Sequence, residues 1–242
     1  MEISVIFPAY NEEQNIQAAM LRARDALRPL FDRFEIIIVD DASQDRTPQI
    51  ADALAAEYPE IRVIHNKPNK GQGESILIGF RAARHSLLIH NAMDYPFDLK
   101  DLRLMLPALA EADVVVAARV RRAGYTLYRK LTSVVNIALL HLLFEPKLRD
   151  YNFVQLYRKT VFDSLPVQSR GPAFVTPEML IRAHDMGYRI KEVEIEYHAR
   201  ERGEATAGKP LVILRSLRDM LAFWLQRRRE RSAAPVAKEE RA

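Results

Sequence analysis

Acidic residues follow two apolar runs of this 242-residue chain, at points where buried strands would end. Asp40 and Asp41 come directly after the run FEIIIV, and Asp94 comes shortly after the run LLI at residues 87–89. An acidic residue in such a position can hold a metal ion or polarise a substrate. Divalent cations that bridge phosphates usually bind more than one protein oxygen. Asp94 is therefore half of a broken metal site, the whole of a different one, or a residue that only caps the next helix.

The elements that would position these carboxylates alternate along residues 1–118. Apolar runs predict five strands, and the segments between them predict helices over Asn11 to about Leu27, Thr47 to about Glu57, Ser75 to Arg84, and residues 98–112. The first helix would be capped by Asn11, with two glutamates in its first turn. This alternation predicts an α/β fold in which helices cover both faces of a mostly parallel sheet. Ligands of such sheets bind at the carboxyl ends of the strands.

The second half of the chain differs in character. It predicts an apolar helix over residues 125–144, a short strand over 152–158, a helix over 176–187 and an alternating strand over 188–198. An amphipathic helix is predicted over residues 210–230, with its arginines towards the end. We therefore expect a domain over 1–209, with halves at 1–118 and 119–209, then this helix and a disordered tail over 231–242.

Composition excludes several classes of protein. The chain has no cysteine, so disulfides and thiolate metal sites are excluded. Met1 leads directly into a strand-like run, from which we expect no signal peptide, and no uninterrupted apolar window of about 18 residues predicts a membrane span. The net charge of +4 is low for a protein that binds nucleic acid. We expect a cytoplasmic globular protein without a nucleic-acid partner.

Five sequence segments, taken in order and at their spacing, indicate a function more specifically than composition does. They read SVIFPAYNEEQNI, EIIIVDDASQDRT, NKGQGESILIGFRAA, DYNFVQLYRK and GYRIKEVEIEYHARERGEA. Together they resemble the family-2 glycosyltransferases with the GT-A fold, in particular the dolichol-phosphate and polyprenyl-phosphate sugar transferases. The resemblance extends from about Ile3 to about Lys209. It implies a Rossmann-like, mostly parallel sheet followed by a C-terminal amphipathic helix.

The resemblance also implies roles for individual residues. The nucleotide-binding positions of the family fall on Pro8, Tyr10, Glu12, Asp40, Asp41, Lys70 and Gly71. Among these, Asp41 would read the base, because a carboxylate accepts the imino hydrogen of uracil or guanine. The positions that hold phosphates fall on Arg119, Arg129 and Arg202. Asp94, Arg129 and Arg202 would be the catalytic set.

Around Asp94 the family pattern is Asp-x-Asp-x-Gln. Without gaps, Asp94 falls on the second Asp, whereas Ala92 replaces the first and Pro96 replaces the Gln. Asp94 alone can hold Mg²⁺ or Mn²⁺ through one carboxylate if a diphosphate and waters complete the shell. Asn91 could add an amide oxygen if the strand end shifts by one residue. The alternative is that Asp94 binds no metal and Asp98 only caps the next helix.

The implied reaction is displacement, with inversion, at the anomeric carbon of a UDP- or GDP-sugar. A polyprenyl phosphate acceptor (dolichyl or undecaprenyl) is already an anionic nucleophile, and arginines would hold it beside the donor. A hydroxyl acceptor would need a general base. The Glu-Asp pair of many such relatives reads Glu178-Met179 here, and their Gln-x-x-Arg-Trp signature is absent. Both departures favour a phosphate acceptor.

Basic residues flank the apolar helix over 125–144 and the helix after Pro210. Such helices could be ordinary core, but they also suit a membrane interface. We expect a peripheral enzyme at the inner face of the cytoplasmic membrane that serves the cell envelope, and a separate membrane-spanning subunit is a conceivable partner. The alternative function is a nucleotide-sugar-binding scaffold, or inactive homologue, that kept the fold and lost turnover at its degenerate metal site.

Overall fold

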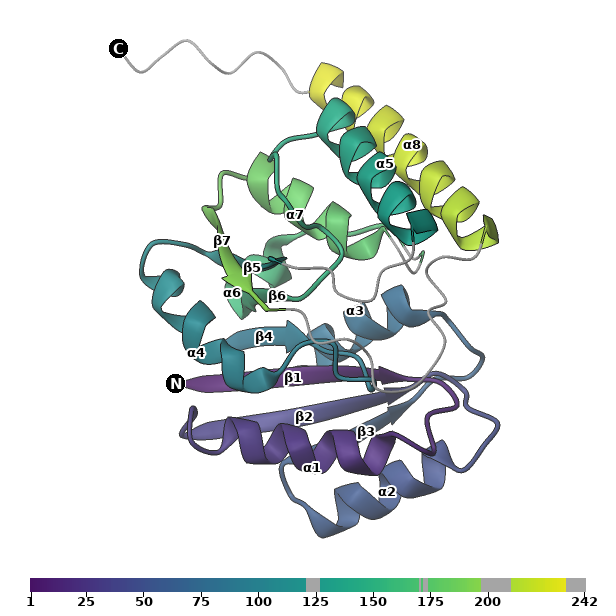
Figure 1. Ribbon diagram of the computed structural model, residues 1–242, viewed down its shortest axis with the longest axis vertical. Helices are drawn as coiled ribbons and strands as arrows, with labels where there is room; N and C mark the ends of the chain where they lie inside the picture. Colours follow the sequence, from purple (N-terminus) through teal and green to yellow (C-terminus); the bar gives the residue numbers. More distant parts are fainter. Residues whose placement is uncertain (121–126, 170, 172–173, 197–209, 234–242) are drawn as a thin grey trace.

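The computed structural model describes residues 1–120, 127–169, 171, 174–196 and 210–233. These residues form a seven-stranded sheet with the strand order β3-β2-β1-β4-β6-β5-β7 (Figure 1). The strands are β1 (Glu2–Ala9), β2 (Arg33–Asp40), β3 (Ile61–His65), β4 (Leu87–His90), β5 (Val114–Arg119), β6 (Gln155–Arg158) and β7 (Ile190–Ile195). β6 runs antiparallel to β4 and β5, and the other neighbouring pairs are parallel. The mostly parallel sheet that the sequence predicted is confirmed.

Two hydrophobic cores cover the two faces of this sheet. Successive strand residues point to opposite faces, so Val5 and Phe7 of β1 enter one core and Ile6 enters the other. The first core is closed by α1 (Ile16–Leu27) and α2 (Thr47–Glu57). The second core is closed by α3 (Gln72–Ala82), α5 (Leu127–Leu143), α6 (Lys159–Ser164), α7 (Val175–Asp185) and α8 (Pro210–Ala233). Burial on both faces explains why the strands read as continuous apolar runs.

Two of the predicted helices are wrong in detail. Helix α1 begins at Ile16 and not at Asn11, because Asn11 adopts a left-handed backbone with φ +56° and belongs to a loop. The segment over 98–112 is not one helix. It consists of a 3₁₀ turn (Leu99–Asp101), the short α4 (Leu102–Met105) and a second 3₁₀ turn (Leu106–Ala110). Pro107 lies in the second turn, where it lacks the N–H group that an α-helix would need.

Helices α5 and α8 lie side by side at one end of the molecule (Figure 1). Phe144 and Phe223 pack with their ring centroids 5.6 Å apart, and Phe174 lies at the same distance from Phe223. Arg227 of α8 donates two hydrogen bonds of 2.5 Å to Asp185 at the end of α7. The predicted C-terminal amphipathic helix is therefore joined to the domain by aromatic packing and by an ion pair.

No described helix combines the length and the apolar composition that crossing a bilayer requires. The tail predicted over 231–242 begins too early, because α8 continues to Ala233. From position 234 onward the predicted tail lies outside the described residues.

Candidate functional site

Four strand ends meet at the carboxyl edge of the sheet. The register pairs Ala9 of β1 with Asp40 of β2, and Asp40 with His65 of β3. On the other side of β1, Ile6 pairs with His90 of β4. Neighbouring strands lie about 4.8 Å apart, so the loops that follow β1 to β4 leave the sheet close together. These loops contain most of the residues that the sequence motifs assigned to the nucleotide.

Asp41 holds the loop after β3 in place. Its Oδ1 accepts hydrogen bonds of 2.8 Å from Asn66 Nδ2 and Lys70 N, and its Oδ2 accepts one of 2.7 Å from Gly71 N. The Asp41 carbonyl oxygen accepts a further bond from Asn69 Nδ2. Gly71 has φ +86°, a conformation that other residues rarely adopt. The loop over residues 69–71 is therefore built around a carboxylate that is only 3% exposed.

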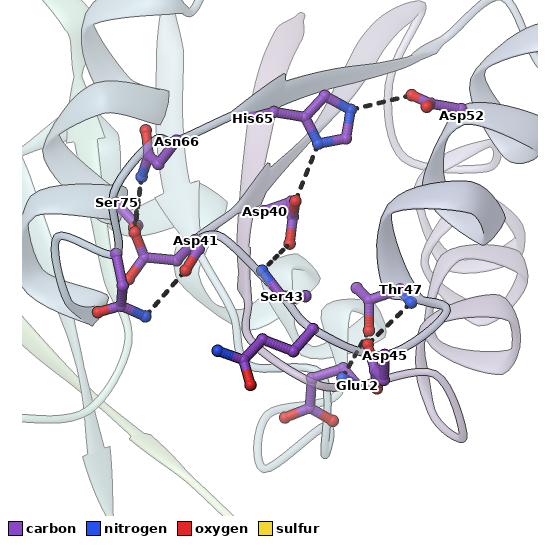
Figure 2. Close-up of polar contacts among 12 residues, drawn as sticks. Glu12, Asp40, Asp41, Ser43, Asp45, Thr47, Asp52, His65, Asn66 and Ser75 are labelled. Atoms are coloured by element: carbon purple, nitrogen blue, oxygen red, sulfur yellow. Dashed lines mark hydrogen bonds and ion pairs between the residues drawn. The ribbon is translucent and has the colours of Figure 1, made fainter.

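Asp40 is as buried as Asp41, and its carboxylate has two hydrogen-bond contacts. Its Oδ1 accepts a hydrogen bond of 3.1 Å from Ser43 N, and its Oδ2 lies 2.9 Å from His65 Nδ1. The other ring nitrogen of His65 lies 3.1 Å from Asp52 Oδ1, so this ring bridges two carboxylates (Figure 2). The hydrogen bond to Asp40 is the main cause that raises the pKa of His65 above its ordinary value, and the bond to Asp52 adds to it.

The loop after β1 is joined to the loop after β2 by hydrogen bonds. Asn11 N donates to Ser43 Oγ at 3.0 Å. Glu12 N donates to Thr47 Oγ1 at 2.7 Å (Figure 2). Asp45 accepts hydrogen bonds from Glu13 N and Thr47 N. Burial opposes the charge of Asp45, but these bonds outweigh it and hold the pKa of that carboxyl below its usual value. Asn11, Glu12 and Glu13 therefore order a loop and do not begin a helix.

Three of the residues assigned to the nucleotide are at least partly exposed to solvent at this edge of the sheet. Pro8 is partly buried at the end of β1, and Tyr10 is 47% exposed in the loop that follows. The side chain of Lys70 is exposed. An exposed aromatic ring and an exposed ammonium group beside bonded carboxylates can contact a planar base and a phosphate.

Asp94 lies in a loop that its neighbours hold firmly. The buried Asn91 donates to Phe97 O at 2.9 Å and accepts from Ala92 N at 3.0 Å, so its amide shapes the loop. Tyr95 follows Asp94 with φ +53°, a strained conformation for a residue with a side chain. Strain of this kind persists only where the surroundings impose it. Asp94 itself is partly exposed.

The ring of Tyr95 anchors this loop to the first core. It is 7% exposed, stacks on Phe7 with centroids 6.5 Å apart, and receives the guanidinium of Arg22 at 4.2 Å. Burial raises the pKa of Tyr95. On the opposite face, burial lowers the pKa of His90 to about 4, so this histidine is neutral at neutral pH. Packed rings therefore lie on both sides of Asp94 in the sequence, His90 before it and Tyr95 directly after it.

Tyr95→Ala is expected to destabilise the protein by about 3–5 kcal/mol, the usual cost of removing a large buried ring. Tyr95→Phe keeps the ring and is the matched control, for which we expect a much smaller change. Urea denaturation of the two variants measures the difference. Equal stabilities of the alanine and phenylalanine variants would show that the ring does not anchor the loop.

The three arginines assigned to phosphates have different surroundings. Arg119 ends β5, donates to Asp150 at 2.6 and 2.9 Å, and lies over the Phe153 ring at 4.8 Å. Its guanidinium is therefore largely bonded within the protein. Arg129 lies in α5, but its side chain is outside what the structure describes, and Arg202 is outside the described residues altogether. Asp98 accepts a hydrogen bond from Lys100 N, which confirms its role as a cap.

Sequence reasoning missed several residues that shape the site. His65 is the most important, and its position at the end of the predicted strand IRVIH was a usable signal. The others lie in the segment VDDASQDRT or just after β3, and the motifs assigned none of them to the site: Ser43, Asp45, Thr47 and Asn66.

The described residues contain no group of three or more His, Cys, Asp or Glu side chains that could hold a metal ion. Asp94 contributes one carboxylate, and Ala92 has no donor to add. Mg²⁺ often binds through one or two carboxylates together with substrate phosphates and waters. The donor set therefore fits a cation shared with a diphosphate, and it does not fit a cage made by the protein alone.

Comparison with known proteins finds curated relatives of similar sequence. A dolichol-phosphate mannosyltransferase of Pyrococcus furiosus is 32% identical over 224 residues, which cover 85% of this chain and 59% of that protein. An undecaprenyl-phosphate mannosyltransferase of Micrococcus luteus is 30% identical over 224 residues, which cover 88% of this chain and 90% of that protein. The chain spans between 33% and 64% of the length of three curated relatives, the Pyrococcus protein among them.

Solved structures share the fold. Glucosyl-3-phosphoglycerate synthase of Mycobacterium tuberculosis, crystallised with Mn²⁺, UDP and phosphoglyceric acid, superposes with a TM-score of 0.69. That match covers 92% of this chain and 78% of the synthase chain. Because the two sequences are only 22% identical, the match shows similarity of fold alone. The family described as glycosyl transferase family 2 matches residues 4–166. The chain therefore belongs to glycosyl transferase family 2, which is the family that its sequence motifs indicated.

Proposed function

We propose that this glycosyltransferase moves a sugar, with inversion, from a nucleoside-diphosphate sugar to a polyprenyl phosphate at a membrane surface. The observation that carries the proposal is the loop organised by Asp41 at the carboxyl edge of the sheet, in a chain whose relatives are named as polyprenyl-phosphate sugar transferases. The division into a nucleotide half over 1–118 and an acceptor half over 119–209 belongs to this proposal.

The bonding of Asp41 leaves capacity for a base. An ionised carboxylate has about four acceptor sites, and three of those on Asp41 are used by Asn66, Lys70 and Gly71. The remaining site, on Oδ2, can accept the imino hydrogen of uracil or guanine. The exposed ring of Tyr10 and the exposed Lys70 would flank the base and the diphosphate, next to Pro8 and the loop of Glu12.

Asp94 would hold Mg²⁺ or Mn²⁺ against the diphosphate of the donor. A divalent cation in that position neutralises the charge that develops on the leaving group. The protein's part is to keep the carboxylate in place, through the amide of Asn91 and the buried ring of Tyr95. The crystallised Mycobacterium synthase, which holds Mn²⁺ and UDP, is compatible with this use of the fold.

The acceptor phosphate would attack the anomeric carbon as an anion, so no general base is required. It must be brought close to a donor that is also negatively charged, and arginine is suited to this because it binds phosphate oxygens through two N–H groups. Arg129 and Arg202 are the residues proposed for this role. Arg119 would contribute less net positive charge, since Asp150 binds its guanidinium.

Donor binding followed by transfer tests the proposal. In a thermal-shift panel of UDP-sugars and GDP-sugars, we expect one nucleotide class to raise the melting temperature, more so with Mn²⁺, because ligands that bind the native state stabilise it. With that donor, undecaprenyl phosphate should be glycosylated, and EDTA should slow the reaction. Nucleotide binding without product under any metal would contradict the enzyme and favour the scaffold alternative.

An exposed apolar face supports placement at a membrane. On α5, exposed side chains recur at helical spacing: Leu131, Val134, Val135, Ala138 and Leu142. On α8, exposed leucines lie among exposed arginines: Leu214, Arg215, Arg218, Leu221, Leu225, Arg228 and Arg229. Apolar residues beside arginines suit the interface of an anionic bilayer, where each basic residue contributes about 1 kcal/mol to membrane binding.

The relatives reported above provide no support for a separate membrane-spanning subunit, and the proposal does not include one.

The double variant Leu131→Glu/Val135→Glu is expected to lose binding to vesicles, because two charges would enter the apolar face. Cosedimentation with phosphatidylglycerol vesicles measures binding, with phosphatidylcholine vesicles for comparison. Leu104→Glu is the matched control, since Leu104 is exposed on α4 outside this face. Unchanged sedimentation of the double variant would show that α5 does not contact lipid.

A further inference from the structure

His65 lies where two elements of the nucleotide half face each other. Its Nδ1 is 2.9 Å from Asp40 Oδ2 at the end of β2, and its Nε2 is 3.1 Å from Asp52 Oδ1 on α2 (Figure 2). The Asp40 side chain is 3% exposed, that of His65 is 34% exposed and that of Asp52 is 65% exposed. Asp40 and Asp52 are the charged groups that contact this ring among the described residues.

This geometry selects one protonation state of the ring. Ionised carboxylates accept hydrogen bonds and cannot donate them, whereas a neutral imidazole donates from only one of its nitrogens. A neutral ring would therefore direct a lone pair at one of the two carboxylates. The imidazolium donates from both nitrogens and satisfies both acceptors. The raised pKa of His65 agrees with this reading.

A chain of hydrogen bonds leads from His65 to the loop after β1. His65 contacts Asp40 Oδ2, Asp40 Oδ1 accepts from Ser43 N, and Ser43 Oγ accepts from Asn11 N at 3.0 Å. Asn11 lies between Tyr10 and Glu12 and has a left-handed backbone that its contacts must maintain. The ring at the end of β3 thus supports the shape of two loops at the proposed nucleotide site.

We propose that His65 is a positioning residue for the donor nucleotide, and that its imidazolium, held between Asp40 and Asp52, makes nucleotide binding dependent on pH. The charged ring also balances part of the negative charge of Asp40, next to the site where a diphosphate would bind. This inference rests on the proposed function, because it takes the ligand to be a nucleoside diphosphate at this edge of the sheet.

The direction of the effect follows from linkage. The folded pKa of His65 is raised above the ordinary value of 6.5. The stabilisation from the charged ring is therefore fully present below about pH 6.5 and is lost as the pH rises through the raised value. Nucleotide affinity should fall over the same interval. If affinity depends on the imidazolium, bound nucleotide must in turn raise the pKa of His65.

The experiment measures the Kd of UDP and of GDP by calorimetry, with Mg²⁺, from about pH 5.5 to about pH 9, which brackets histidine titration. The variants are His65→Gln, which keeps a hydrogen-bond donor without charge, and Asp52→Asn, which removes the outer carboxylate. His85→Gln is the matched control, because His85 Nδ1 lies 3.1 Å from Glu2 Oε2 at the opposite edge of the sheet. Titration of the His65 ring by NMR, with and without nucleotide, gives a second readout.

For the wild type and the His85 variant, we expect the nucleotide Kd to rise about fivefold across the titration of His65, the difference between a charge-assisted and a neutral hydrogen bond. The His65→Gln variant should bind weakly at all these pH values, without that step. Asp52→Asn should move the step to lower pH. Nucleotide should raise the pKa that NMR measures.

Two outcomes would overturn the inference, and they differ in what they imply. If the wild type and His65→Gln bind nucleotide with the same pH profile, His65 is not a positioning residue, and the proposed function stands. If the wild type binds neither UDP nor GDP at any pH, the proposed function fails and the inference fails with it.

Discussion

Asp94→Ala is expected to lower the rate of sugar transfer about a hundredfold or more, because it removes the one carboxylate proposed to hold the cation at the leaving diphosphate. Losses of this size follow when an enzyme loses a single group that stabilises developing charge. Initial rates with saturating donor and acceptor measure the effect. The hydrogen bonds of the buried Asn91 amide, which shape this loop, do not involve the Asp94 side chain.

Asp98→Asn is the matched control for this experiment. Asp98 lies in the same loop, caps Lys100 N and pairs with Arg22 at 3.2 Å, but it is not proposed to contact the donor. Its replacement should reduce stability modestly and leave the transfer rate nearly unchanged. Activity that survives Asp94→Ala would place the diphosphate elsewhere.

Ala92→Asp is the complementary gain of function. It restores the first acidic position of the family pattern, and a second carboxylate should lower the Mn²⁺ concentration at which the transfer rate is half-maximal. Metal titrations of wild type and variant measure the shift. An unchanged metal requirement would indicate that the gapless placement of the pattern on Ala92 and Asp94 is wrong.

Asp41→Ala is expected to cost both stability and nucleotide binding. The carboxylate accepts hydrogen bonds from Lys70 N and Gly71 N, and its removal leaves both backbone groups without their partner. Each such loss costs about 1–3 kcal/mol where the group stays buried. The loop over residues 69–71 should loosen, and the site that would accept the base disappears. Urea denaturation measures the first effect and calorimetry with UDP and GDP measures the second.

Two further variants separate these effects of Asp41. Asp41→Asn keeps the shape and one acceptor oxygen, so we expect it to retain more stability than alanine while still losing affinity. Asp163→Asn is the surface control, because Asp163 forms an exposed pair with Lys159 on α6 that contributes little. If Asp41→Asn binds nucleotide as the wild type does, Asp41 does not read the base.

Much of the fold could be predicted because its signals are local. Strands buried on both faces appear as apolar runs, and the alternation of strands and helices implies a parallel sheet. The helix over 98–112 was predicted wrongly in spite of a visible local signal, since Pro107 interrupts it. The helix predicted to start at Asn11 failed for a different reason. Asn11 and Glu12 bond to Ser43 and Thr47, which are distant in sequence.

The candidate site, like the fold, was predicted from the sequence only in part. By itself, the sequence determined the family and the strand ends that carry the polar residues, and it predicted that Asp94 is the remaining carboxylate of a reduced metal motif. Only the tertiary structure decided what those residues contact: that Asp41 orders the loop of Gly71, that Asp150 binds Arg119, and that His65 bridges Asp40 and Asp52. The physical reason is that residue types and short-range spacing identify a group's chemistry, whereas hydrogen bonds between loops depend on strand register and on the paths of chain segments far apart in sequence.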